Sequence, residues 1–212
     1  MNRIDQCMHS LRQKNRKSLV MFLTAGDPDL QATEQLIPAI ADAGADIIEL
    51  GVPFSDPVAD GPTIQEASER ALAAGTTMPK ILETVRRVRR RVETPLVLFS
   101  YYNVILQYGA ERLAADAAEA GIDGWLVVDL PAEERDEVAP YLQKHGLHLV
   151  PLLAPTTPEE RVRKLLAGAG GFVYYISVTG VTGARDTLPA DLAEHLKTIK
   201  QRTDLPVVAG FG

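Results

Sequence analysis

Three acidic side chains lie within one short stretch, ELGVPFSDPVADGP, which covers residues 49–62. Glu49 stands near the end of the apolar run ADIIELG, so it is expected on a buried strand, on the same face as Ile47 and Gly51. A carboxyl group buried without a cationic partner has a raised pKa and tends to stay protonated, which suits general acid/base catalysis. The alternative is a structural glutamate paired with a buried basic residue, but no lysine or arginine stands at the C-terminal end of an expected strand.

The other two acids fall in the loop after this strand. Asp60 could be a helix cap, but Thr63 followed by Glu66 fits the capping-box pattern better and leaves Asp60 free to point into a site. A plain turn role for Asp60 stays open. Asp56 precedes Pro57, and of the three acids it best fits a turn residue only.

Two glycine-rich stretches follow the last apolar runs: SVTGVTGA at residues 177–184 and AGFG at residues 209–212. Such loops can present backbone N–H groups to an anion, and barrel enzymes often bind phosphate with their late loops, although glycine also marks ordinary turns. These features predict an enzyme with a carboxylic acid catalyst, a phosphorylated substrate and no strand-end lysine for Schiff-base chemistry. Aromatic residues near strand ends could line a flat apolar pocket: Phe22, Tyr101, Tyr174 and Phe211.

Alternating strands and helices must position these side chains. Seven short apolar runs alternate with segments of helical periodicity, which indicates a parallel sheet with helical crossovers. Long loops follow nearly every run, and no GxGxxG motif follows the first, which favours an α/β fold of the TIM (β/α)8-barrel type over an open dinucleotide-binding sheet. The sequence has no linker, so residues 1–212 are expected to form one domain. A second capping-box pattern, Thr157 followed by Glu160, predicts another helix start. The expected strands lie within residues 18–26, 46–51, 95–101, 124–130, 147–153, 172–178 and 205–211.

Composition narrows the class of partner. The chain has 212 residues, a net charge of −6 and one cysteine, so nucleic acid, anionic membrane, an internal disulfide and a cysteine-based zinc site are not expected. The histidines are scattered, so no metal site is expected. Residues 1–17 lack the apolar core of a signal peptide and fit an amphipathic helix, and the expected location is cytoplasmic. The arginine-rich run at residues 85–92 is predicted to be a solvated helix face.

The stretch that carries the three acids resembles the signature of the tryptophan synthase alpha chain family. The resemblance starts from ELGVPFSDPVADGPTIQ and extends through FLTAGDPD, SYYN, VVDLP, SVTGVTGAR and the terminal GFG, in the family's order. It implies a lyase of tryptophan biosynthesis that cleaves indole-3-glycerol phosphate to indole and glyceraldehyde 3-phosphate by a retro-aldol reaction without a cofactor. It also implies a tryptophan synthase beta chain as partner, in a heterotetramer.

The same resemblance implies roles for individual residues. Glu49 matches the acid/base that moves protons between the indole C3 atom and the glycerol hydroxyl. Asp60 matches the acid that stabilises positive charge at the indole N–H, and Tyr174 matches an active-site tyrosine. The other implied positions are an indole pocket at Phe22, Phe99, Tyr101 and Phe211, a phosphate site at Gly183 and Gly212 beside the loop residue Thr182, and a beta-chain interface at Pro53 and Asp56.

Members of this family continue beyond the GFG with a helix, an eighth strand and a phosphate loop. The resemblance therefore predicts a barrel that lacks its eighth βα unit, with open edges on its first and last strands and little activity alone. Two alternatives stay open. One is a catalytically inactive barrel fragment that keeps only folding or beta-chain binding. The other is a related phosphosugar barrel enzyme such as indole-glycerol-phosphate synthase, which uses strand-end lysines that this sequence lacks.

Overall fold

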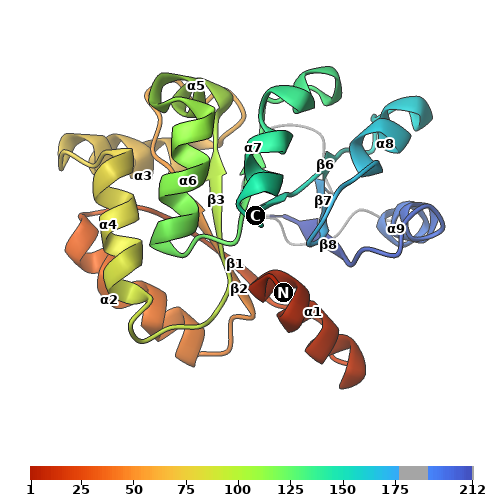
Figure 1. The fold of residues 1–212 in the computed structure, drawn as a ribbon, viewed down its shortest axis with the longest axis horizontal. Helices are drawn as coiled ribbons and strands as arrows, with labels where there is room; N and C mark the ends of the chain where they lie inside the picture. Colours follow the sequence, from red (N-terminus) through yellow and green to blue (C-terminus); the bar gives the residue numbers. More distant parts are fainter. Residues whose placement is uncertain (177–190, 212) are drawn as a thin grey trace.

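Strands and helices alternate along the chain in the computed structural model, which describes residues 1–176 and 191–211 (Figure 1). The strands are β1 (Val20–Thr24), β2 (Ile47–Gly51), β3 (Leu96–Ser100), β4 (Gly124–Val127), β5 (His148–Leu149), β6 (Leu152–Leu153), β7 (Val173–Ile176) and β8 (Val207–Gly210). The helices are α1 (Arg3–Gln13), α2 (Leu30–Asp42), α3 (Pro62–Ala73), α4 (Met78–Val88), α5 (Tyr102–Tyr108), α6 (Ala110–Ala120), the 3-10 helix η1 (Ala132–Glu137), α7 (Ala139–Lys144), α8 (Glu159–Leu166) and α9 (Leu192–Lys200).

Parallel strands in sequence order form the wall that carries the acids. β1 to β5 make one sheet and β6 to β8 another, and within each sheet every strand pairs with the next strand along the chain. This unidirectional order, with helices outside, is the arrangement of a barrel. Along one register row of the first sheet, Phe22, Glu49, Val97 and Gly124 are neighbours. Within the described part of the chain, β1 and β8 are not paired with each other.

The two sheets meet where the strand expected at residues 147–153 is interrupted. Pro151 has no N–H group, so it cannot donate to a neighbouring strand. Backbone bonds still cross the interruption, because the N–H of Val150 donates to the carbonyl of Trp125 at 2.8 Å and the N–H of Tyr174 donates to the carbonyl of Pro151 at 2.9 Å. All seven predicted strand positions are confirmed, and one of them is split into β5 and β6.

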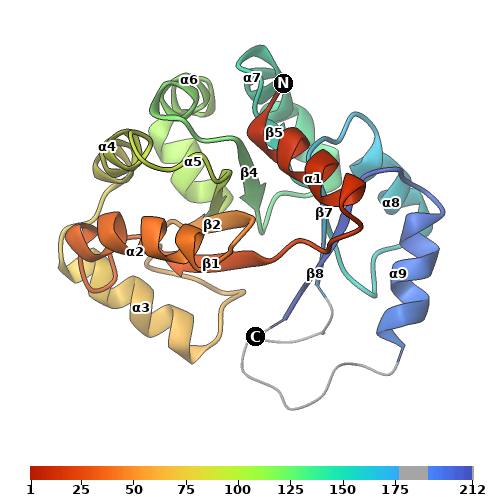
Figure 2. The same ribbon diagram turned by 90° about the horizontal axis from the view of Figure 1, so that it is seen from below.

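Apolar clusters lie on both sides of this wall. One fills the space between β1–β5 and helices α2, α4, α5, α6 and α7, and a second lies between β6–β8 and helices α8 and α9. The third lies inside the wall, where α1 contributes Ile4, Met8 and Leu11. The predicted amphipathic helix is therefore confirmed. Figure 2, seen from below, shows α1 across the lower end of the strands.

Proline rather than threonine marks two helix starts, so both predicted capping boxes are wrong. α3 starts at Pro62 with Gly61 at the N-cap position, and no side chain caps it, so Thr63 is already inside the helix. The hydroxyl of Thr157 accepts a 2.9 Å hydrogen bond from the N–H of Ala154 instead of capping α8. Pro62 occupies the first position of α3, where its fixed φ suits a helix, and Pro158 is the N-cap residue of α8, which begins at Glu159.

The arginine run at residues 85–92, which covers the last turn of α4 and the residues after it, is only partly solvated. Arg90 and Arg91 are exposed, as predicted for a solvated face. Arg89 contradicts the prediction, because its side chain is 8% exposed and pairs with Asp123 at 2.7 Å. Arg89 is the C-cap residue of α4, and its guanidinium also donates to the carbonyls of Gly121 and Thr94. A charge pattern on one segment cannot show such a distant partner.

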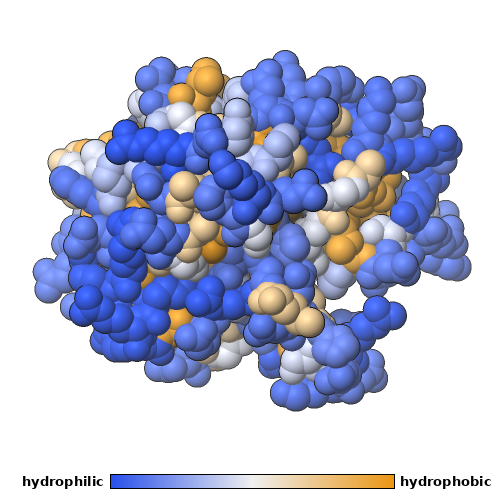
Figure 3. Space-filling model, in the orientation of Figure 1, coloured by the Kyte–Doolittle hydropathy of each residue, from blue (hydrophilic) through white to orange (hydrophobic). Residues whose placement is uncertain are grey.

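The surface in Figure 3 is largely hydrophilic, with a group of apolar side chains between α8 and α9. A cavity of about 210 Å³ lies there, and Tyr175, Val162 and Ile199 are among the residues that line it. Tyr175 points outward from β7, whereas its neighbour Tyr174 packs in the interior cluster. This cavity is therefore on the opposite side of the wall from Glu49.

Candidate active site

Glu49 lies in the middle of β2, between Ile48 and Leu50, which pack outward against the helices. The residue is 3% exposed, and its Oε1 atom is buried with no hydrogen-bond partner among the described residues. Burial raises the pKa of the carboxyl from an ordinary 4.5 to about 8. The expected dry carboxyl without a cationic partner is found, and at neutral pH it is mostly protonated. Such a group can give a proton and take one back.

Aromatic rings lie beside Glu49 in the barrel interior. Phe22 is its register neighbour on β1. The ring of Phe22 meets that of Phe99 edge-on at 5.3 Å between centroids, and Phe99 meets Tyr174 edge-on at 6.1 Å. Burial, and secondarily the negative charge of Glu49, raises the pKa of the Tyr174 phenol, so this hydroxyl stays protonated near the carboxyl. The structure thus brings together three of the predicted pocket residues around the candidate acid/base.

Two glycines make room for these rings. A Cβ atom added at Gly51 would lie 2.3 Å from Cζ of Phe22, and one added at Gly210 would lie 2.1 Å from the hydroxyl oxygen of Tyr174. Both distances are shorter than any side chain tolerates without movement of the ring. The sequence placed Gly51 on the same face as Glu49, but it did not show which ring fills the vacated space.

Asp60 forms a second polar group with Tyr101. The Tyr101 hydroxyl donates a 2.9 Å hydrogen bond to Oδ2 of Asp60 and accepts a 3.0 Å bond from the N–H of Ala59. The ring of Phe54 packs on Tyr101 at 5.1 Å between centroids. Burial raises the pKa of Asp60, and the hydrogen bond from Tyr101 opposes that rise. The side chain of Asp60 does not cap α3, whose N-cap residue is Gly61.

The family model of the tryptophan synthase alpha chain matches residues 8–212. The chain belongs to the tryptophan synthase alpha chain family. It is 58% identical to the tryptophan synthase alpha chain of Geobacter sulfurreducens and 55% identical to that of Geotalea daltonii, in each case over 100% of this chain and 80% of the relative. The solved alpha subunit from Legionella pneumophila has a TM-score of 0.92 at 43% identity and covers 100% of this chain and 79% of its own.

A tryptophan synthase α2β2 complex from Pyrococcus furiosus also matches in structure, with a TM-score of 0.85 at 43% identity, over 92% of this chain and 78% of that one. The resemblance seen in the motifs is confirmed, and so are the barrel fold and the class of enzyme, a lyase of tryptophan biosynthesis. Membership of the alpha chain family also sets aside the indole-glycerol-phosphate synthase alternative.

The loop after β2, at residues 52–61, carries the two positions expected at a beta-chain interface. Asp56 is exposed, and its Oδ2 accepts a 2.5 Å hydrogen bond from the hydroxyl of Ser55. Pro53 is buried in the free chain, so it shapes this alpha-chain loop from within. The expected interface role of both residues stays a prediction.

The remaining predicted site residues are at the late loops. Phe211 is 65% exposed, and no ring contact joins it to the other aromatic residues in the described part of the chain. Thr182, Gly183 and Gly212 lie outside the described residues. The expected phosphate site of this alpha chain is therefore untested, and its residues stay predictions.

Residues 1–176 and 191–211 contain no group of three or more histidine, cysteine, aspartate or glutamate side chains that could hold a metal ion. No helix there is long and apolar enough to cross a membrane.

Proposed function

We propose that this alpha chain cleaves indole-3-glycerol phosphate to indole and glyceraldehyde 3-phosphate. The observation that carries the proposal is the carboxyl of Glu49, which is buried beside a set of aromatic rings, has a pKa of about 8 and has no hydrogen-bond partner for Oε1 among the described residues. A proton donor and acceptor with a pKa near the working pH is what a retro-aldol cleavage needs. Family membership supplies the substrate class.

In the proposed reaction Glu49 acts twice. Its protonated carboxyl first gives a proton to the indole C3 atom, which leaves positive charge on the ring. The resulting carboxylate then takes the proton of the adjacent glycerol hydroxyl. The bond between C3 and the glycerol carbon breaks, its electron pair returns to the ring, and the hydroxyl oxygen becomes the aldehyde oxygen. Protons and charge balance, and Glu49 ends protonated as it began.

Asp60 stabilises the charged ring between these two proton transfers. Positive charge on the indole nitrogen is greatest after C3 is protonated, so a carboxylate aimed at the N–H acts mainly on the transition state. The hydrogen bond from Tyr101 supports this role, because it holds the Asp60 carboxyl in place and counters the effect of burial on its pKa.

The indole ring is held by flat apolar contacts and the phosphate by backbone N–H groups. Phe22, Phe99 and Tyr174 supply aromatic surfaces next to Glu49. Gly183 and Gly212, with the loop residue Thr182, are proposed for the phosphate, and Phe211 for the edge of the ring pocket. No cofactor takes part in this scheme.

A tryptophan synthase beta chain is the proposed partner, in an α2β2 heterotetramer located in the cytoplasm. The matching Pyrococcus furiosus structure is of such a complex. The exposed Asp56 is proposed to face the beta chain. The buried Pro53 is proposed to fix the shape of the loop that presents Asp56 at this interface. This loop joins Glu49 to Asp60, so a partner seated on it would sit next to both acids.

The decisive experiment is an indole-release assay with indole-3-glycerol phosphate, alone and with the beta chain. Glu49→Gln keeps the size of the side chain and should lower turnover at least ~10²–10⁴-fold. Glu66→Gln, an exposed site on α3, is the matched control and should behave as wild type. Wild-type turnover in Glu49→Gln would contradict the proposal. Beta-chain binding without any turnover by the unmodified chain would favour the inactive-barrel alternative.

A further inference from the structure

Helix α1 closes the barrel at the N-terminal ends of the strands. Its buried face consists of Ile4, Met8 and Leu11, and Ile4 is 0% exposed. These side chains pack in the same cluster as inward-facing residues from five positions around the wall. Those residues are Ile47, Val97, Leu126, Val150 and Phe172. The helix therefore forms an apolar floor beneath the interior that contains Glu49.

Ile4 reaches the register row of Glu49. That row continues from Glu49 through Val97 to Gly124. A Cβ atom added at Gly124 would lie 3.3 Å from Cδ1 of Ile4 and 2.8 Å from the carbonyl oxygen of His148. Gly124 has no side chain, so the Cδ1 methyl of Ile4 packs where one would stand. The floor is thus fitted to the wall two strands away from the carboxyl.

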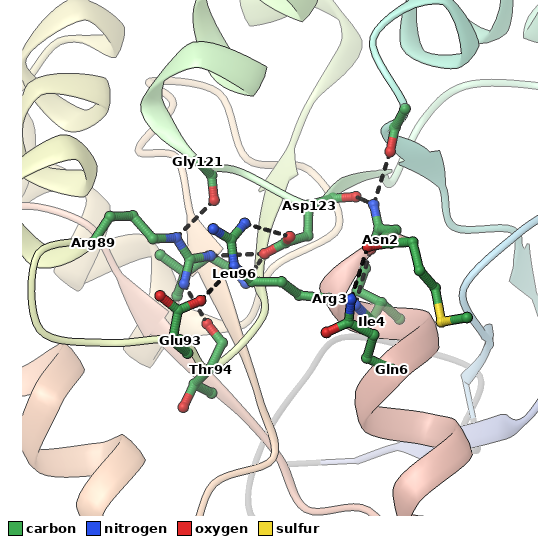
Figure 4. Close-up of polar contacts among 12 residues, drawn as sticks. Asn2, Arg3, Ile4, Gln6, Arg89, Glu93, Thr94, Leu96, Gly121 and Asp123 are labelled. Atoms are coloured by element: carbon green, nitrogen blue, oxygen red, sulfur yellow. Dashed lines mark hydrogen bonds and ion pairs between the residues drawn. The ribbon is translucent and has the colours of Figure 1, made fainter.

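A buried carboxylate fixes the first turn of α1 to this wall. Figure 4 shows Arg3 from α1 and Arg89 from the end of α4 converging on Asp123. The Oδ1 atom of Asp123 accepts a 3.1 Å hydrogen bond from Arg3, and Oδ2 accepts bonds from Arg89 at 2.7 Å and from the Leu96 N–H at 2.9 Å. The side-chain amide of Asn2 donates to the Asp123 carbonyl at 2.7 Å. These bonds tie the start of β4 to the start of α1.

Further contacts hold the middle of α1 to other strands. Oδ1 of Asp5 lies 2.8 Å from Nε2 of His148, the first residue of β5. The thiol of Cys7 donates to the carbonyl of Asp46, just before β2, at 3.3 Å. The floor is therefore anchored at the starts of three strands, and one of them, β2, carries Glu49.

The groups around Glu49 show which physical effect sets the protonation state of its carboxyl. Within the interior cluster, the titratable groups are the Tyr174 phenol on β7 and the partly buried Cys7 thiol on α1, and in the loops beyond β2 and β3 Asp60 pairs with the Tyr101 hydroxyl. Arg3 and Asp5 of α1 turn outward to partners at the rim. The neighbouring strands β1 and β3 offer Phe22 and Val97, which are apolar. Exclusion of water, more than a neighbouring charge, therefore sets the protonation state of Glu49.

We propose that α1 is a positioning element for the acid/base function of Glu49, with Ile4 sealing the interior against water and the Arg3–Asp123 pair holding the seal in place. The inference rests on the proposed function of Glu49 and adds to it a residue set that does not touch the substrate. Water admitted through the floor solvates the carboxylate form of Glu49. The carboxyl then titrates at lower pH and is less often protonated at neutral pH.

The test is a pH titration of the Glu49 carboxyl by ¹³C NMR, without substrate. Glutamate is labelled at Cδ, and the Glu49 signal is assigned by its loss in Glu49→Gln. Ile4→Val removes only Cδ1, the atom that packs over Gly124, and Ile4→Ala removes more of the seal. Ile4→Val should lower the titration midpoint of Glu49 slightly, and Ile4→Ala should lower it more. The expected shift in Ile4→Ala is about one pH unit, which is a tenfold change in the ionisation equilibrium.

Matched controls separate sealing from general loosening of the core. Ile37 on α2 is also 0% exposed but packs in the outer cluster, so Ile37→Val and Ile37→Ala should leave the Glu49 midpoint unchanged. If Ile4→Ala does not fold, Arg3→Ala loosens the same end of α1 and should lower the midpoint by a smaller amount. An unchanged midpoint in the folded floor variants, or an equal shift in the Ile37 controls, would overturn the inference.

The lyase assay distinguishes the floor from the proposed function. If Glu49 is the acid/base and Ile4 seals the interior, the alkaline limb of the pH–rate profile of Ile4→Ala moves to lower pH together with the NMR midpoint. A midpoint that moves while the profile stays fixed would overturn the acid/base role of Glu49 and leave the seal intact. A midpoint that stays fixed while Glu49→Gln is inactive would overturn the seal and leave the acid/base role intact.

Discussion

The hydroxyl of Tyr101 donates a 2.9 Å hydrogen bond to Asp60 and accepts a 3.0 Å bond from the N–H of Ala59. One buried phenol therefore holds both the side chain of Asp60 and the backbone just before it. The tyrosine follows β3, whereas the acid lies in the loop after β2, so the bond joins two neighbouring βα loops. It also favours the carboxylate form of Asp60, against the effect of burial.

Tyr101→Phe should shift the acidic limb of the pH–rate profile to higher pH. The hydrogen bond that lowers the pKa of Asp60 is lost, so Asp60 becomes ionised only at higher pH. The free energy of unfolding should fall by about 0.5–1.5 kcal/mol, the usual value of one such bond. Tyr102→Phe is the matched control, because its hydroxyl bonds to Glu137 instead. An acidic limb that stays in place in Tyr101→Phe would show that Tyr101 does not tune Asp60.

Asp60→Asn should lower kcat far more than it raises KM. The amide keeps the shape of the carboxylate but removes the charge that faces the ring as positive charge develops. Loss of one such electrostatic contact typically costs ~10²–10³-fold in kcat. Steady-state kinetics with indole-3-glycerol phosphate, together with the Kd of an indole-containing ground-state analogue, give the comparison. An equal loss in both quantities would make Asp60 a binding residue only.

Stability should fall with rising pH because of Glu49. Its folded pKa of about 8 lies above its ordinary value of 4.5, so between these values the folded chain holds a proton that the unfolded chain has released. The favourable contribution is complete below pH 4.5 and is lost as the pH rises through about 8. The two pKa values correspond to a loss of up to about 5 kcal/mol. Urea unfolding at pH 5, 7 and 9 measures it, and Glu49→Gln should show a much weaker dependence; equal slopes in both proteins would contradict the assignment.

The wall of the barrel could be predicted from the sequence because its signals are local. Apolar runs and helical periodicity located every strand position, and Ile4, Met8 and Leu11 predicted the face of α1. The interruption at Pro151 was not predicted, and the helix caps at Gly61 and Pro158 were not predicted either, since threonine patterns pointed to other caps. Where two local signals compete over a few residues, sequence alone does not show which of them wins.

In the candidate site too, features that depend on local sequence could be predicted, and contacts between residues distant in sequence could not. Glu49 could be predicted as a buried carboxyl, because it stands in an apolar strand expected to be dry on both faces and no basic residue stands at an expected strand end. The polar role of Tyr101 and the burial of Arg89 could not, because their partners Asp60 and Asp123 are distant in sequence. Such contacts follow only from the order in which the strands surround the interior. The family resemblance named Tyr101 for its ring, and the hydroxyl contact came from the structure.

Gly51→Ala should destabilise the chain, and shortening Phe22 should rescue it. The new Cβ atom would lie 2.3 Å from Cζ of Phe22, and that ring already meets Phe99 at 5.3 Å, so it must leave its position beside Glu49. Overpacking of this kind costs about 1–3 kcal/mol of unfolding free energy, and a displaced ring should also raise KM. Phe22→Leu removes the clashing ring atoms, so the double variant should be more stable than the sum of the single changes predicts, with a coupling energy of about 0.5–3 kcal/mol. Urea unfolding of the wild type, both single variants and the double variant measures this coupling. A value near zero would mean that the ring of Phe22 does not occupy the space over Gly51.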